Sequence, residues 1–265
     1  MREIVRLFED TETIDELGIG QIRDTFSNLL FPGTSVLLTR ARYYLFVPWA
    51  FQLAAERKKT NPAAILSTAE NYERSLIEAI RKSGDLEGLI GRQAGTKVRT
   101  LPSQIYWGGL ASYGILAAGI SPQQISRPAD PVDDSDELTE RRFGHWSPTL
   151  PARPAGFPYE VPDGFALSPE EAGWLRERIL TSVPDSLLAR LTLVPGTTLD
   201  ATDSVGPWDG CRSLDLSDEI KRYLNHAELF SLAIHGAALL YNLMAAKLFA
   251  ANGFTNPQRN VEPDF

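Results

Sequence analysis

This chain has only one cysteine and no excess of positive charge. Cys211 is its only cysteine, which excludes an internal disulfide framework and fits a reducing compartment, so we predict a cytoplasmic protein. The formal net charge of −8 excludes a generic nucleic-acid coat protein but leaves room for a local basic groove. The first six residues, Met1-Arg-Glu-Ile-Val-Arg, are charged from the start, and this predicts that no secretory signal peptide is present.

Recognisable catalytic motifs are lacking as well. The glycines from Gly88 to Gly95 precede Thr96-Lys97, whereas a phosphate-binding loop needs lysine before serine or threonine, between a strand and a helix. Glu56-x-Lys58 is half of a nuclease motif without an acidic partner. The three histidines lack the neighbours of a metal site. We therefore predict no metal and no cofactor, and we favour a non-enzymatic protein.

One long uncharged run is present. Residues 229–246 contain no Asp, Glu, Lys or Arg, and their number meets the length that a membrane-spanning helix needs. The run also holds Ser231, His235 and Asn242, and no basic cluster flanks it. We predict the central buried helix of a soluble domain and no membrane insertion.

Helical spacing dominates the rest of the chain. Residues 62–83 begin with Pro62 and place Ile65, Ala69, Tyr72, Leu76 and Ile80 on one face. Helices are also predicted over 1–8, 21–30 and from Thr39 as an N-cap, and strand signals are weak. The predicted fold class is mainly α: a multi-helix orthogonal bundle around the long apolar C-terminal helix, with a long proline-rich loop.

Composition divides the chain into three parts. Residues 1–127 form an N-terminal helical half, 128–167 a proline-rich, acidic linker or long loop, and 168–265 a C-terminal helical half. Ser168-Pro-Glu-Glu171 opens that half with a capping box, in which serine and glutamate pair with the free backbone groups. The two halves are either separate or one domain interrupted by a long excursion.

Arg40 and Arg42 stand out because they open the predicted apolar helix, at the N-terminal end where the helix dipole disfavours positive charge. One interpretation is that both reach solvent or pair with Asp24 or a nearby glutamate. The other is an anion site for phosphate or nucleic acid, since a guanidinium group matches a phosphate. The basic residues Arg92, Lys97 and Arg99 would then extend it into one groove, or else form an ordinary solvated face.

Several runs carry a resemblance to a known family. They are Gly20-Gln-Ile-Arg-Asp-Thr-Phe26, Thr39-Arg-Ala-Arg-Tyr-Tyr-Leu-Phe-Val-Pro-Trp49, Leu101-Pro-Ser-Gln-Ile-Tyr-Trp107 and Leu240-Tyr-Asn-Leu-Met244. On these runs the chain resembles the bacterial family "domain of unknown function 6361" over most of its length. The resemblance brings no catalytic residues. It implies relatives that are longer at both ends, in line with a predicted first helix that starts without a cap, and a setting near phage-defence and helicase-like genes.

Two functional hypotheses follow. The first is a non-enzymatic helical subunit of a larger, nucleic-acid-directed bacterial defence assembly, with protein partners. The second is a nucleic-acid-binding protein or nuclease that uses Arg40, Arg42, Arg92, Lys97 and Arg99. Salt-dependent DNA binding separates the two.

Overall fold

The computed structural model describes residues 18–57, 62–125, 145–195, 206–211 and 214–252. The chain forms two compact units, Met1–Gly196 and Thr197–Phe265. The predicted helix over 1–8 lies outside the described residues. The described part of unit 1 contains α2 (Ile19–Leu30), α3 (Tyr43–Arg57), α4 (Pro62–Ser83), the 3-10 turn η1 (Gly95–Lys97), α5 (Pro102–Ser112), α6 (Pro122–Ile125), α8 (Pro169–Ser182) and α9 (Leu187–Leu191). The described part of unit 2 contains α10 (Pro207–Cys211) and α11 (Asp218–Ala251).

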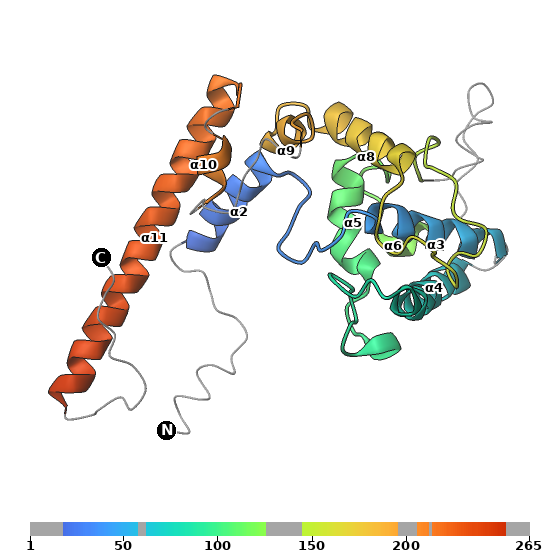
Figure 1. Ribbon diagram of the computed structural model, residues 1–265, viewed down its shortest axis with the longest axis horizontal. Coiled ribbons are helices and arrows are strands. Elements are labelled where there is room, and N and C mark those ends of the chain that lie inside the picture. Colours follow the sequence, from blue (N-terminus) through green and yellow to red (C-terminus); the bar gives the residue numbers. More distant parts are fainter. Residues whose placement is uncertain (1–17, 58–61, 126–144, 196–205, 212–213, 253–265) are drawn as a thin grey trace. The chain divides into compact units, whose positions relative to one another are not determined.

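The prediction of a mainly α fold with a long C-terminal helix is confirmed (Figure 1). Among the described residues no strand forms, and the only extended pairing is one isolated bridge between Leu116 and Trp146. The helix predicted over 62–83 is α4 with those same bounds.

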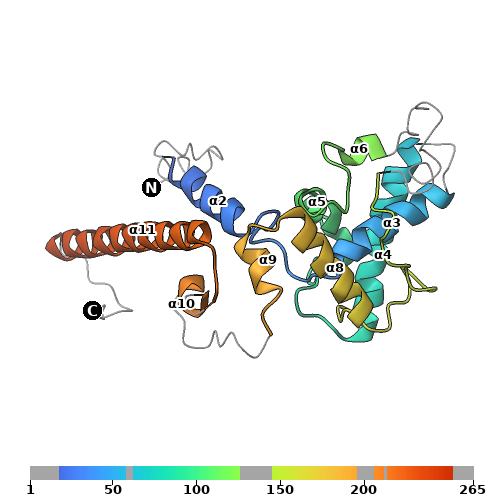
Figure 2. The same ribbon diagram turned by 90° about the horizontal axis from the view of Figure 1, so that it is seen from above.

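The core of unit 1 surrounds α3, which packs against α4 and α5 (Figure 2). Every residue from Tyr43 to Phe51 is buried, including Pro48 inside the helix. Trp49 is fully buried and its indole N–H donates to the carbonyl oxygen of Pro151 at 2.7 Å. A helix that is apolar on all sides needs neighbours on all sides, and α3 obtains them within its own unit.

The predicted role of the C-terminal helix as the buried centre of the fold is wrong for the described residues. In α11 only Ile220 and Leu224 are buried, and none of its most apolar 18-residue window is. By length and composition only, α11 is long and apolar enough to cross a membrane, and it is the one such helix among the described residues. The prediction failed because an uncharged run indicates that a helix needs apolar neighbours but does not indicate which part of a structure supplies them.

The proline-rich segment contributes to the core where it is described. Trp146, Phe157, Val161 and Phe165 belong to the same buried cluster as α3 and α4 residues such as Phe46 and Tyr72. Residues 145–191 therefore belong to the same compact unit as the N-terminal helices, and the boundary between units falls at Gly196–Thr197. Aromatic side chains spaced through this segment give it enough apolar surface to bury.

Local capping signals set the helix starts in most places. The Ser168 hydroxyl accepts from the Glu171 N–H, and the Glu171 carboxylate accepts from the Ser168 N–H, which confirms the capping box. The prediction of Thr39 as the N-cap of α3 is wrong, because α3 begins only at Tyr43. The Thr39 hydroxyl instead donates to the carbonyl oxygen of Gly88 at 2.6 Å, which ties the turn before α3 to the loop after α4.

Candidate functional site

Arg40 lies in the turn before α3 and is held by the loop after α4. Its Nε donates to the Glu87 carbonyl oxygen at 2.9 Å, and one terminal nitrogen lies 3.4 Å from the Asp85 carboxylate and 3.5 Å from that of Glu87. The guanidinium group also lies 5.6 Å from the centre of the Phe165 ring. With a third of its side chain exposed, Arg40 is neither free nor fully buried.

Arg42 is buried, with 3% of its surface exposed. Its terminal nitrogens donate to the Gly164 carbonyl oxygen at 2.8 Å and to the Glu171 carboxylate at 3.0 Å, and the guanidinium group lies over the Phe46 ring. The sequence-based alternative of pairing with Asp24 is wrong, because Asp24 pairs with Arg23. The alternative of pairing with a glutamate holds for both arginines.

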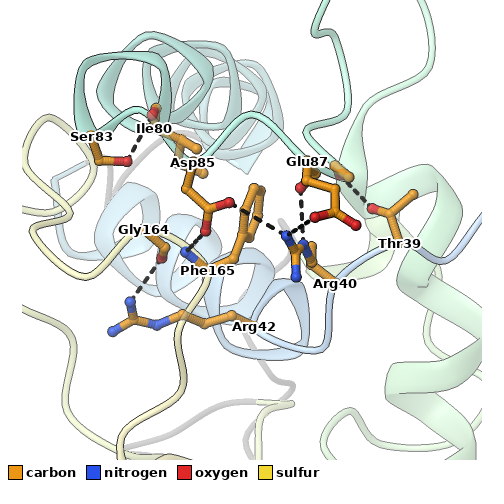
Figure 3. A network of polar contacts seen from close by, with 10 residues as sticks. Thr39, Arg40, Arg42, Ile80, Ser83, Asp85, Glu87, Gly164 and Phe165 are labelled. Carbon is orange, nitrogen blue, oxygen red and sulfur yellow. Dashed lines mark hydrogen bonds and ion pairs between the residues drawn. The ribbon is translucent and has the colours of Figure 1, made fainter.

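Together the two arginines fix the turn that leads into α8, and we call Arg40, Arg42, Asp85, Glu171 and the turn at 164–165 the arginine clamp. Figure 3 shows the part of it around Asp85 and Gly164. The Asp85 carboxylate takes the Arg40 guanidinium on one oxygen and the Phe165 backbone N–H on the other, at 3.1 Å. The clamp joins three stretches that lie far apart in sequence. Most of its polar groups are hydrogen-bonded or ion-paired to one another, which is typical of a structural role.

The basic loop after α4 is a separate feature from the arginine clamp. The side chains of Arg92, Lys97 and Arg99 are exposed, and none of the three forms an ion pair with another described residue. Two arginines of α4 hold the loop backbone: Arg74 donates to the carbonyl oxygens of Thr96 and Val98, and Arg81 to that of Arg92. Of the five predicted anion-binding residues, these three present free charge to solvent.

Glu73 is a buried carboxyl group that sequence reasoning missed. It is 1% exposed and accepts from the Ser103 N–H at 2.6 Å and the Ser103 hydroxyl at 2.8 Å, so it satisfies the free N-terminal end of α5. Burial raises the pKa of Glu73 to about 7, although the hydrogen bonds from Ser103 lower it in part. A signal was present, since Glu73 interrupts the apolar face that Ala69 and Leu76 define.

Other candidate chemistry finds no support in the described chain. The described residues hold no group of three or more His, Cys, Asp or Glu side chains that suits a metal ion. Glu56 forms a two-pronged ion pair with Arg153, with N–O distances of 3.0 and 2.7 Å, and Lys58 lies outside the described residues. An open pocket of about 500 Å³ lies nearby, between Gln52 and residues 150–155.

The described part of unit 2 exposes many apolar side chains along α11. Nine large apolar side chains between Leu229 and Phe249 are at least 38% exposed, and Tyr241 reaches 72%. Monomeric soluble proteins rarely expose a continuous apolar patch of more than a few hundred Å² without a use for it. Such a surface is typical of a contact with another macromolecule.

An internally clamped helical core and a largely exposed apolar helix define the class: an all-helical protein, as far as the described residues go. The chain belongs to the family described as "Family of unknown function (DUF6361)", which matches residues 1–264. No curated protein and no solved structure matches the chain.

Proposed function

We propose that this protein is a non-enzymatic subunit of a larger protein assembly in the bacterial cytoplasm, and that α11 carries the contact. The observation behind this is the exposed, uncharged stretch 229–246 of α11. Burying apolar surface of this kind is the main driving force for protein association. The arginine clamp adds support, because it uses Arg40 and Arg42, the most unusually placed charged residues, in contacts that stabilise unit 1.

The setting that we propose for this assembly is nucleic-acid-directed phage defence. It rests on the family resemblance, whose implied setting is near helicase-like genes. A subunit of this kind holds other components in place and leaves the chemistry to them.

Affinity purification of the tagged chain from nuclease-treated native lysate tests the proposal. We expect stoichiometric protein partners, further copies of this chain included, and their loss when Leu232→Glu and Leu239→Glu place charge on α11. Arg222→Glu, at an exposed position of the same helix, is the matched control and is expected to keep the partners. Recovery of the chain alone, or equal recovery with both variants, would contradict the proposal.

One observation favours the second candidate function, nucleic-acid binding. Arg92, Lys97 and Arg99 lie exposed on a single loop and form no ion pair with another described residue, and phosphate contacts need such charge. In this proposal the affinity for DNA or RNA falls with salt, and replacing all three residues by alanine removes most of it. Each lost phosphate contact is expected to reduce the slope of log K against log salt by about 0.9 for duplex DNA.

The matched control for this test is the pair Lys221→Ala and Arg222→Ala on α11, which leaves the loop unchanged. Arg40→Ala with Arg42→Ala is a poor choice, because it breaks the arginine clamp. Fluorescence anisotropy with labelled duplex and single strands at low salt gives the readout. Absence of binding, or equal binding by both sets of variants, would rule out this loop as the interface.

A further inference from the structure

The basic loop after α4, residues 88–101, lies in a stretch of the chain that carries no negative charge. Residues 88–129 contain no Asp or Glu, although acidic residues outnumber basic ones by 34 to 26 over the whole sequence. The acidic residues just before the loop are engaged elsewhere, since the carboxylates of Asp85 and Glu87 lie 3.4 and 3.5 Å from the Arg40 guanidinium group. The exposed cations of the loop, which form no ion pair with another described residue, are Arg92, Lys97 and Arg99.

Arg81 of α4 determines which way one peptide group of the basic loop points. Its side chain donates to the Arg92 carbonyl oxygen at 2.6 Å. A trans peptide group is planar, so its N–H points opposite to its C=O. Because this C=O points toward α4, the N–H of the same peptide, on Gln93, points away from the helix. Gln93 is exposed, and its N–H donates to no acceptor in the part of the chain that the structure describes.

Arg74, two turns earlier on α4, orients a second peptide group in the same way. Its side chain donates to the Val98 carbonyl oxygen at 2.9 Å. The N–H of that peptide, on Arg99, therefore also points away from α4, and it too finds no acceptor among the described residues. The loop thus presents two backbone donors outward, each next to an exposed guanidinium group.

Glycines bring these two peptide groups close together. Gly91 has a φ of +83°, and a Cβ atom added there would lie 3.1 Å from the Gly95 carbonyl oxygen and 3.3 Å from the Val98 Cβ. The Gly95 N–H donates to the Gly91 carbonyl oxygen at 2.7 Å. The loop therefore folds back on itself, so that residues 92–93 and 98–99 are neighbouring parts of one surface.

We propose that the basic loop binds two phosphate groups of a nucleic-acid backbone. One phosphate accepts from the Gln93 N–H and the Arg92 side chain, and the other from the Arg99 N–H and the side chains of Lys97 and Arg99. Backbone N–H groups together with arginine and lysine side chains are common donors to the phosphates of nucleic acids. Two such positions on one loop need a ligand that carries phosphates at regular intervals, which a polymer supplies.

The basic loop lacks the side chains that stack on bases. Residues 84–101 contain no Phe, Tyr, Trp or His. Proteins that bind single strands combine a basic surface with aromatic side chains on which the bases stack. Contacts to phosphate alone fix the position of a protein on a duplex and carry no sequence information. The ligand class that fits the loop is the backbone of a double helix, bound without regard to sequence.

This inference deepens the second candidate function, nucleic-acid binding, and names the ligand and its donors. Fluorescence anisotropy of the full chain with labelled duplexes of two unrelated sequences, and with their single strands, tests the ligand. We expect equal affinity for the two duplexes and weaker binding of the single strands. The slope of log K against log salt is expected to be about −2.7 for duplex DNA, from three cation contacts at about 0.9 each.

The outcomes separate this inference from the function on which it rests. Duplex RNA is measured alongside duplex DNA, and binding of either duplex supports the inference. Tighter binding of the single strands, or a preference for one duplex sequence, would overturn the inference and leave the second candidate function standing. Absence of binding to every nucleic acid at low salt would overturn both.

Arg81→Met tests the orientation of the loop, because it releases the Arg92 carbonyl and keeps every exposed cation of the loop. Lys82→Met, at the next and exposed position of α4, is the control that removes the same charge. Both are made in a Glu78→Gln background, since Glu78 lies 3.4 Å from Arg81 and would otherwise lose its partner. We expect Arg81→Met to lower the duplex affinity roughly tenfold more than Lys82→Met does. Equal affinities would overturn the role of Arg81.

Amide NMR of the isotope-labelled parent chain reports on the backbone donors directly and needs no variant. On addition of duplex DNA we expect the largest shifts at the amides of Gln93 and Arg99. The amides of Lys97 and Val98 are the internal control, because they already donate to carbonyl oxygens within the loop, at 3.2 and 3.1 Å. A bound duplex that leaves the Gln93 and Arg99 amides unshifted would overturn the two phosphate positions.

Discussion

Replacing Arg42 with methionine is expected to lower the free energy of unfolding of unit 1 by about 3–5 kcal/mol. Arg42→Met removes the partner of a buried carboxylate, on Glu171, and leaves the Gly164 carbonyl oxygen without its donor. Much of the cost comes from the Glu171 charge, which stays buried and loses its counter-charge. Urea unfolding followed by tryptophan fluorescence measures it.

Arg153→Met is the matched control for Arg42→Met. Arg153 forms a comparable ion pair with Glu56, but 30% of the arginine and 53% of the glutamate side chain are exposed. Exposed pairs contribute about 0–1 kcal/mol, so this substitution is expected to change stability little. Equal, small effects of both substitutions would contradict a structural role for the arginine clamp and return Arg42 to consideration as an anion-binding residue.

Glu73 is expected to make unit 1 less stable as the pH rises from 4.5 to about 7. Its pKa is raised from 4.5 to about 7 by burial in the folded chain, so the unfolded chain loses its proton first. The carboxyl therefore stabilises the fold fully below pH 4.5, and that contribution is lost as the pH rises through the folded pKa. The loss amounts to about 3 kcal/mol at most, by the energy equivalent of a pKa shift.

Glu73→Gln isolates this contribution, because the amide keeps a hydrogen-bond acceptor for Ser103 and does not titrate. The difference in unfolding free energy between parent and variant is expected to fall between pH 4.5 and 7 and then level off. Glu78→Gln, on the exposed side of α4, is the control and is expected to give a flat difference. A flat difference for Glu73→Gln as well would show that its pKa in the folded chain is ordinary.

Local sequence rules predicted most of the helices. The Ser168 capping box and the proline at the start of α4 act within one helical turn, so their effect does not depend on the rest of the fold. The apolar spacing of residues 62–83 identified the buried face of α4 for the same reason. Thr39 shows the limit of such rules, because its hydroxyl found a partner in a distant loop.

The candidate sites depended on contacts that no local pattern contains. Arg40 and Arg42 were recognisable as unusual, but Asp85 and Glu171, which neutralise them, follow 45 and 129 positions later in the chain. The same holds for Glu73 and Ser103, 30 positions apart. A buried charge requires a partner, and only the folded chain determines which one lies within reach.

The sequence by itself determined that this chain is mainly helical, where α4 and α8 begin, and which residues are too apolar or too charged to be left without partners. The tertiary structure alone decided which helix becomes the core. Both α3 and α11 are rich in apolar residues, yet α3 is surrounded by α4, α5 and the 145–191 segment, whereas the described neighbours of α11 cover only Ile220 and Leu224. The physical reason is that burial depends on the neighbours that the fold supplies, and apolar composition only creates the need for them.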